Sequence, residues 1–261
     1  MKLTLYQIDA FASELFSGNP AAVCVLDAWL DDTLMQQIAM ENNLSETAFV
    51  VKKDNLYQIR WFTPMFEVNL CGHATLASAF VIFTYYDKQA TIIDFYSPKS
   101  GALSVAKNND LFTLNFPADF VDSMSPSKEL LEAMGTVPME SYKGKDDCML
   151  VYKNQKQIEA LSPDFGKLSR CGWRGVIATA PGNSVDFVSR FFAPNCGVDE
   201  DPVTGSAHTK LIPYWSNKLG TKQLFARQLS KRGGYLECQD LGKRVAISGK
   251  AVPYLKGEIF L

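Results

Sequence analysis

Short runs of apolar residues, either continuous or alternating with polar ones, recur along most of the chain. Runs of this length and composition are typical of β-strands rather than of helices. They predict strands at residues 3–9, 21–26, 48–51, 58–62, 91–96, 111–116, 149–152, 176–180, 186–192 and 244–248. We therefore expect a chain that is rich in β-sheet.

Helical spacing of apolar residues is limited to a few segments. One helix is expected to begin at Asp31 and another at Ser125, and two longer helices near His73 and near Gly205. Many strands combined with few helices predict the α+β class, in which mostly antiparallel sheets each pack around or beside one helix.

The sequence contains a weak internal repeat. Residues 60–64 match residues 190–194 at an offset of 130 positions, about half of the 261-residue chain. In both copies an aromatic strand ends at proline, crosses a loop of small and acidic residues, and leads into an apolar helix. We therefore predict two similar halves, residues 1–119 and 120–261, and leave open that the last strand crosses back to the first half.

Composition and charge restrict the class of partner. Apolar residues make up 47% of the chain and charged residues 21%, which is ordinary for a globular protein. The 26 basic side chains nearly balance the 28 acidic ones, so no strong field attracts nucleic acid or an anionic membrane surface. We expect a small-molecule substrate, with neither a nucleic-acid nor a membrane partner.

The cellular location is expected to be the cytoplasm. The amino-terminal residues alternate as a strand would and lack the apolar core of a signal peptide. No segment reaches the roughly 18 apolar residues of a membrane span. The six cysteines are scattered, without a Cys-x-x-Cys pair, which is typical of a reducing compartment.

The only two histidines fall in the repeated segments, where two helices are expected to begin. Gly72 precedes His73 in one segment, and Gly205 and Ser206 precede His208 in the other. A helix start presents unpaired backbone N–H groups and the positive end of the helix dipole, which favour a carboxylate. Two such ends facing each other across a cleft would bind an anionic substrate and stabilise the carbanion formed when a proton is removed beside its carboxylate.

This chemistry needs a base, and Glu46 is the candidate. It lies between an expected helix end and the start of an apolar strand. In a partly dry cleft the charged form of a carboxylate is disfavoured, so its pKa would move toward neutrality and suit acid and base catalysis. The sequence is equally compatible with a turn at residues 45–47 that Glu46 merely closes.

Three further residues have both a structural and a functional interpretation. His73 would bind the substrate or shuttle a proton, or else bond a nearby loop; its place in the repeated motif favours function. Asp201 would act catalytically by orienting a substrate amine or hydroxyl or by helping to relay a proton, or else it would complement the helix dipole. His208 lies about one turn into its helix, where a structural role is favoured. Asn19, in a strand-entry turn, is a candidate substrate contact.

Cofactor binding is not indicated by the motifs. Cys71, His73, Asp201 and His208 are possible metal ligands, but their spacing matches no common zinc pattern. The chain has no GxGxxG segment and no P-loop. We expect no metal and no organic cofactor.

Four motifs together resemble the phenazine-biosynthesis PhzF-like family. They lie at residues 16–23, 45–49, 71–75 and 201–208, and their order and spacing match over essentially the whole chain. The resemblance implies the diaminopimelate-epimerase-type fold, in which two similar halves each wrap a sheet around a central helix and the active site lies in the cleft between them. It also implies a homodimer.

By matching position, the resemblance implies a general acid/base at Glu46. It further implies backbone donors at the two helix starts and substrate contacts from neighbouring side chains: Gly72 and Gly205 as donors, and Ser45, His73, Asp201 and Ser206 as contacts. The name-giving member isomerises a dihydro-hydroxyanthranilate, with the glutamate moving the proton. The resemblance thus implies a biosynthetic, cofactor-independent isomerase, although nothing in the sequence shows a phenazine pathway.

One departure from the related racemases is informative. Those enzymes use two opposed cysteines, whereas this chain has Cys71 in the first half and Asp201 at the matching place in the second. A proton shift through the single base Glu46 is therefore favoured. Two alternatives remain: an amino-acid-type epimerase or racemase that pairs Cys71 with a non-thiol group, and a small-molecule-binding protein without turnover.

Overall fold

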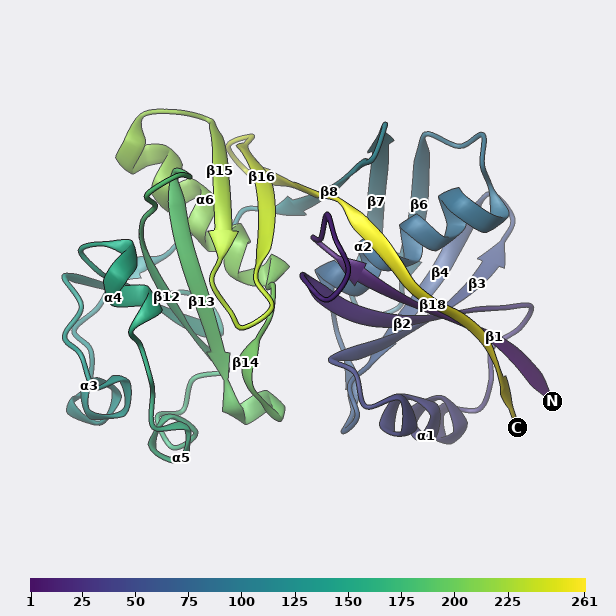
Figure 1. Cartoon of the computed structure of the whole chain (residues 1–261), viewed down its shortest axis with the longest axis horizontal. Coiled ribbons are helices and arrows are strands. Elements are labelled where there is room, and N and C mark those ends of the chain that lie inside the picture. The colour runs from purple at the N-terminus through teal and green to yellow at the C-terminus, as the bar shows by residue number, and fades with distance from the viewer. The chain divides into compact units, whose positions relative to one another are not determined.

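The computed structural model describes all 261 residues, which divide into two compact units (Figure 1). Unit 1 contains Met1–Phe116 and Ala246–Leu261, and unit 2 contains Pro117–Val245. The carboxyl-terminal segment therefore belongs to the same unit as the amino terminus. The chain leaves unit 1 after Phe116, whereas the sequence pattern placed a boundary after residue 119.

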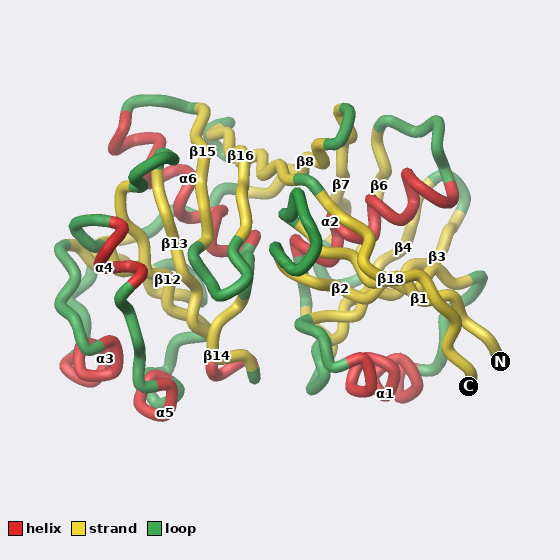
Figure 2. Tube along the Cα trace, in the orientation of Figure 1, coloured by secondary structure: helices red, strands yellow, loops and turns green.

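Unit 1 is built mainly from strands, with two α-helices and one π-helical turn. Its elements are β1 (Lys2–Ala10), β2 (Asn19–Leu26), α1 (Asp32–Asn42), β3 (Glu46–Lys53), β4 (Leu56–Phe62), β5 (Glu67–Val68), α2 (Gly72–Val81), the π-helix Ile82–Tyr86, β6 (Ile92–Ser97), β7 (Gly101–Asn108), β8 (Leu111–Pro117) and, from the end of the chain, β18 (Ala251–Phe260). Figure 2 shows how strongly strands outnumber helices, in agreement with the α+β class.

The strands of unit 1 pair mostly antiparallel around the apolar helix α2. The pairs β2–β3 and β4–β6 are parallel, while β1–β2, β3–β4, β6–β7, β7–β8 and β1–β18 are antiparallel. α2 is buried over most of its length and contacts β1, β2, β3, β7 and β18. Its buried hydroxyls are satisfied within the helix, because Thr75 and Ser78 donate to the carbonyl groups four residues earlier.

Unit 2 contains the remaining elements. They are β9 (Asp122–Ser123), α3 (Lys128–Met134), β10 (Glu140–Lys143), β11 (Asp147–Val151), α4 (Gln155–Glu159), α5 (Phe165–Leu168), β12 (Gly175–Pro181), β13 (Phe187–Ala193), the 3-10 helix Pro194–Cys196, β14 (Val198–Asp201), α6 (Gly205–Leu219), β15 (Gln223–Gln228) and β16 (Gly234–Asp240), followed by β17 (Arg244–Gly249), which leads back into unit 1. No helix in either unit is long and apolar enough to span a membrane.

Six elements of unit 1 have counterparts in unit 2 in the same order, and the strands among them have the same pairings. Parallel β2–β3 corresponds to parallel β11–β12, antiparallel β3–β4 to β12–β13, and parallel β4–β6 to parallel β13–β15. The short antiparallel pairs β4–β5 and β13–β14 precede α2 and α6, respectively. The matched residues 60–64 and 190–194 thus lie at equivalent strand ends.

The arginine of each matched segment has the same local function. Arg60 forms a two-pronged ion pair with Glu67 and stacks over Phe62. Arg190 does the same with Glu200 and Phe192. In both units this pair ties the long strand to the short strand that leads into the helix.

Candidate active site

Strand polarity gathers the polar residues of unit 1 at one edge of its sheet. Because β2 and β3 are parallel, their first residues, Asn19 and Glu46, lie at the same edge. Gly18 makes the turn before β2 with φ +65°, and a Cβ there would overlap the Ala10 carbonyl oxygen, so this turn requires glycine.

His73, in the first turn of α2, is the centre of this group. Its Nδ1 lies 3.1 Å from Asn19 Nδ2 and 3.5 Å from Cys71 Sγ. Its Nε2 lies 3.1 Å from Glu46 Oε2. Asn19 is completely buried and His73 nearly so, while the Glu46 side chain remains 17% exposed. The structure therefore brings together three predicted site residues, Asn19, Glu46 and His73, and adds Cys71.

The environment shifts the pKa of His73 and of Cys71 upward. Burial alone lowers the pKa of His73, but the neighbouring Cys71 sulfur and Glu46 carboxylate outweigh burial and raise it well above 6.5. Burial, together with the Glu46 charge, raises the pKa of the Cys71 thiol to about 11. At neutral pH Cys71 is therefore a protonated thiol, and the charge that favours a protonated His73 is that of Glu46.

The Glu46–His73 contact is close but is not a formed hydrogen bond. Glu46 Oε2 and His73 Nε2 are both buried, and neither has a partner in hydrogen-bond geometry. Both atoms therefore retain the capacity to exchange a proton with a third group. Loose geometry of this kind is common at catalytic sites before the substrate binds.

Glu46, Cys71 and His73 are also the residues of this chain that could hold a metal ion. Their ligand atoms lie within 4.8 Å of one another. However, Cys71 faces Nδ1 of the imidazole and Glu46 faces Nε2, so an ion on one ring nitrogen would have only one of them as a neighbour. This arrangement falls short of the three or four convergent ligands of a zinc site.

Ser45 and Gly72 border the same group. Ser45 lies in the turn between α1 and β3, directly before Glu46, and is partly exposed. Gly72 is the first residue of α2, whose preceding residue makes no side-chain cap and whose first turn has no acidic residue. The backbone donors of this helix start are therefore suited to an anion.

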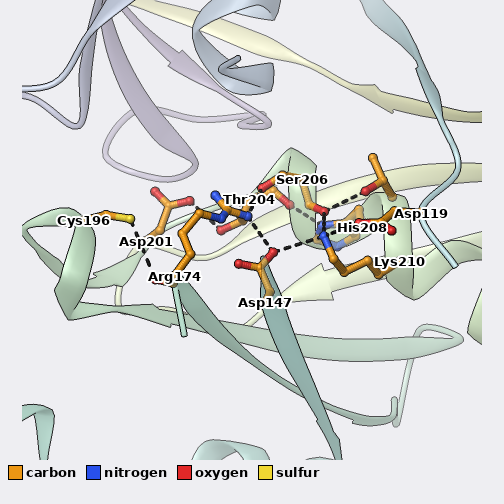
Figure 3. Close-up of polar contacts among 10 residues, drawn as sticks. Asp119, Asp147, Arg174, Cys196, Asp201, Thr204, Ser206, His208 and Lys210 are labelled. Atoms are coloured by element: carbon orange, nitrogen blue, oxygen red, sulfur yellow. Dashed lines mark hydrogen bonds and ion pairs between the residues drawn. The ribbon is translucent and has the colours of Figure 1, made fainter. Parts of the chain in front are cut away.

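In unit 2 the predicted residues surround the start of α6 (Figure 3). Asp201 ends β14 and accepts a 2.5 Å hydrogen bond from the Thr204 hydroxyl. Gly205 is buried and Ser206 is partly exposed, both in the first turn of α6. The Thr204 side chain does not cap this helix either, since it bonds Asp201 instead.

His208 is an interior residue of unit 2. It is fully buried, its Nδ1 lies 2.7 Å from the Thr204 carbonyl oxygen, and its ring packs beside Phe187. Burial lowers its pKa to about 4, so it is neutral under ordinary conditions. These features agree with the structural role favoured from the sequence.

A charged cluster that the motifs did not reveal lies beside Ser206 (Figure 3). Asp147, completely buried at the start of β11, pairs with Arg174 at 2.5 Å and with Lys210 at 3.1 Å. Lys210 also pairs with Asp119 at 2.8 Å, and Arg174 donates to the Ser206 hydroxyl at 3.2 Å. The sequence signal that could have indicated this cluster is Asp147 itself, a charged residue at the start of an otherwise apolar strand. Glu46 has the same position at the start of β3.

The site of Glu46 has no acidic counterpart in unit 2. Ala21 pairs with Glu46 at the start of β3, and Asp147 pairs with Gly175 at the equivalent start of β12. A Cβ at Gly175 would overlap the ring of Phe191, so no larger residue fits there. Unit 2 therefore has no carboxylate at the position equivalent to Glu46.

The fold defines a class of structures that includes epimerases and PhzF-family proteins. A hydroxyproline epimerase from Agrobacterium vitis superimposes with a TM-score of 0.68 over 99% of this chain and 92% of its own, at 9% identity, a likeness in fold alone. A PhzF-family phenazine biosynthesis protein from Enterococcus faecalis superimposes with a TM-score of 0.97 and 48% identity over the whole of both chains.

The sequence comparison identifies the family within this class. Residues 8–257 match the PhzC-PhzF family of phenazine biosynthesis-like proteins, and the chain belongs to that family. It is 52% identical over 261 residues, the full length of both chains, to an uncharacterized isomerase of Pseudomonas aeruginosa. The resemblance noted from the four motifs is confirmed.

Proposed function

We propose that this protein is a cofactor-independent isomerase that shifts a proton on a small carboxylate-bearing substrate, with Glu46 as the general acid/base. The observation that carries the proposal is the buried contact between Glu46 Oε2 and His73 Nε2 at 3.1 Å, beside an uncapped helix start. Family relatives named isomerases support the same reaction class.

Glu46 suits the role of base better than Cys71 does. With a pKa of about 11, the Cys71 thiol holds its proton at neutral pH, and a thiol in that state is a poor base. A carboxylate within reach of a buried site can accept a proton and later return it. The proposal therefore uses one base for both halves of the reaction.

The reaction needs no change in oxidation state. Glu46 removes a proton from a substrate carbon next to a C=C bond, and the electron pair left behind delocalises over that double bond and the substrate carboxylate, so that the double bond moves when a second carbon is protonated. The α2 backbone donors at Gly72 and the His73 imidazolium stabilise this negative charge. The proton on Glu46 can exchange with solvent before Glu46 donates a proton to a second carbon, which completes the isomerisation.

Several residues enter the proposal as substrate contacts. In unit 1 the proposed substrate contacts are Ser45, Asn19 and His73. At the start of α6 they are Asp201, Gly205 and Ser206. Support for Ser206 comes from its hydrogen bond with Arg174, whose positive charge lies close enough to attract a carboxylate. Support for Asn19 is its contact with His73 Nδ1, which would also hold the imidazole in place.

The test is proton exchange by the wild-type protein and by Glu46→Gln. A panel of small carboxylic acids, including a dihydro-hydroxyanthranilate, is incubated in D₂O and followed by NMR for deuterium incorporation and isomerisation. We expect Glu46→Gln to lose at least about 1,000-fold in both rates, within the range that a general acid/base supplies. Glu41→Gln, an exposed change at the end of α1, is the matched control and should keep full activity.

The same experiment distinguishes the two alternatives. If Cys71→Ala is inactive while Glu46→Gln still exchanges protons, the epimerase mechanism replaces the one proposed here. If the wild-type protein is thermally stabilised by an acid of the panel but never exchanges its protons, the chain is a binding protein without turnover.

A further inference from the structure

Unit 2 contains a cavity with a volume of about 650 Å³, which lies in the range of small-molecule binding sites. Its wall comes from four parts of the chain: residues 119–121, β10, the middle and end of α6, and the end of β16 with the turn that follows it. None of the proposed catalytic residues or substrate contacts lines this cavity. It is therefore a separate candidate binding site.

Backbone hydrogen bonds fix the chain segment along one side of the cavity. Pro213 lies inside α6 and has no N–H, so the Thr209 carbonyl oxygen, four residues earlier, lacks its usual partner in the helix. The Asp119 N–H donates to this oxygen at 3.1 Å instead, and the Ala118 N–H donates to the Lys243 carbonyl oxygen at 3.0 Å. Ordered backbone of this kind is expected of a preformed ligand site.

Both lysines of the wall already have acidic partners. Lys210 Nζ lies 2.8 Å from Asp119 Oδ2 and 3.1 Å from Asp147 Oδ2 (Figure 3). Lys218 Nζ lies 2.6 Å from Glu140 Oε1. An anionic ligand would have to compete with these carboxylates for each ammonium group, so the wall does not favour an anion.

The tyrosine hydroxyls of the wall are also in use. Tyr142 and Tyr214 both donate to Glu140 Oε2, at 2.7 and 2.8 Å. Their hydrogens are therefore not available to an acceptor on a ligand. A ligand of this cavity has to supply hydrogen-bond donors of its own.

Asp240 is the carboxylate of the wall that has no basic partner. Its Oδ2 accepts from the Ser216 hydroxyl at 2.8 Å, and its Oδ1 accepts from the Gly242 N–H at 2.8 Å. Neither donor is charged, so no ion pair balances the negative charge of this carboxylate. Each of its oxygens can accept a further hydrogen bond, and a cationic donor satisfies both the charge and the acceptors.

The same cavity has apolar surface for the rest of a ligand. The Phe120 side chain lines it and is 66% exposed, and the ring of Pro213 contributes further apolar surface. Covering such surface with an apolar group is favourable, and the face of an aromatic ring also attracts a cation. The wall thus suits a molecule with one cationic end and an apolar body.

We propose that this cavity binds a small primary amine, whose ammonium group pairs with Asp240 and whose apolar part packs against Phe120. The ligand is chemically opposite to the carboxylate substrate of the proposed reaction. The inference does not depend on that reaction, because the Glu46 group belongs to unit 1 and every residue of the cavity wall belongs to unit 2.

The test is isothermal titration calorimetry of the full chain with two probes of matched shape, phenethylamine and 2-phenylethanol. The amine is a cation at neutral pH, and the alcohol is its neutral counterpart. We expect phenethylamine to bind at least about 10-fold more tightly, because only the ammonium group can pair with Asp240.

Two substitutions assign the binding to this cavity. Asp240→Asn removes the charge but keeps an acceptor, and should lower the affinity for phenethylamine about 10-fold while leaving that for 2-phenylethanol unchanged. Phe120→Ser, at an exposed position, should weaken both probes by a similar factor of about 5. Glu132→Gln, at an exposed acid on α3 outside the cavity, is the matched control and should bind both probes as the wild type does.

Three outcomes overturn the proposal: no binding of phenethylamine up to about 10 mM, equal affinities for the amine and the alcohol, or binding of the amine that neither Asp240→Asn nor Phe120→Ser weakens. Circular dichroism of each variant shows whether the fold is intact. If Asp240→Asn does not fold, Phe120→Ser and the comparison of the two probes decide the result.

Discussion

Acid should destabilise unit 2 through His208, and the size of the effect follows from its burial. The side chain has no exposed surface, and burial lowers its pKa from 6.5 to about 4, against a smaller opposite effect of the hydrogen bond to Thr204. Above pH 6.5 the histidine is neutral in the folded and the unfolded chain, so its contribution to stability is complete there.

Between pH 6.5 and about 4 the unfolded chain takes up a proton at His208 that the folded chain does not. The free energy of unfolding therefore falls as the pH falls through this window and changes no further below it. A shift of this size corresponds to about 3 kcal/mol. No discount for solvent screening applies, because the group is fully buried.

The perturbation is His208→Asn, which retains an N–H donor for the Thr204 carbonyl oxygen but cannot take up a proton. Urea unfolding of both proteins at several pH values gives their free energies of unfolding. Trp215 fluorescence reports on this region, because its indole stacks on Phe187, whose ring lies beside His208. The difference between wild type and variant should shrink by about 3 kcal/mol from neutral pH to pH 4. A difference that stays constant with pH would refute this account.

Three ion pairs of unit 2 give contrasting expectations. Lys210→Met should lower the free energy of unfolding by about 3 kcal/mol in thermal denaturation, because it leaves the buried Asp147 with one partner fewer, whereas Lys128→Met at an exposed pair should cost under about 1 kcal/mol. Glu140, whose pKa is lowered to about 2 mainly by its hydrogen bond from Lys218, contributes stability that is complete above pH 4.5 and is lost as the pH falls toward 2. Because its side chain is 35% exposed, screening reduces this contribution to about 1 kcal/mol, and Glu140→Gln should remove the corresponding slope in acid unfolding.

Local chemistry explains why the helices and the buried strands were predictable. Asp31 caps α1 by accepting from the Thr33 N–H, and Gly135 ends α3 with φ +68°. These signals depend only on neighbouring residues.

Several largely exposed strands lack a clear apolar pattern, and β18 also depends on a partner far along the chain. β7, β15, β16 and β18 were not expected, and β18 contains Pro253 and Gly257, which disfavour strands. Pairing with β1 overrides that preference.

The site shows the same division between local and distant causes. Glu46 and His73 could each be proposed from the sequence, because a polar residue at the start of an apolar strand or helix is visible there. Their 3.1 Å contact, and the burial of Asn19 against the same imidazole, follow from the parallel register of β2 and β3. The Asp147 cluster was missed because its ion-pair partners come from separate segments of unit 2.

The repeated topology explains why a single base suffices in the proposed reaction. The equivalent strands β3 and β12 begin with different residues. β3 begins with the carboxylate Glu46, whereas β12 begins with Gly175, where the Phe191 ring leaves no room for a side chain. The charged side chains beside Gly175 pair with one another, since Arg174 and Lys210 both contact Asp147 and Lys210 also contacts Asp119. A second acid/base could not be added to unit 2 without displacing an aromatic ring from its core. In the proposed reaction the same carboxylate therefore both accepts and donates a proton, as expected of a proton shift rather than of a two-base racemisation.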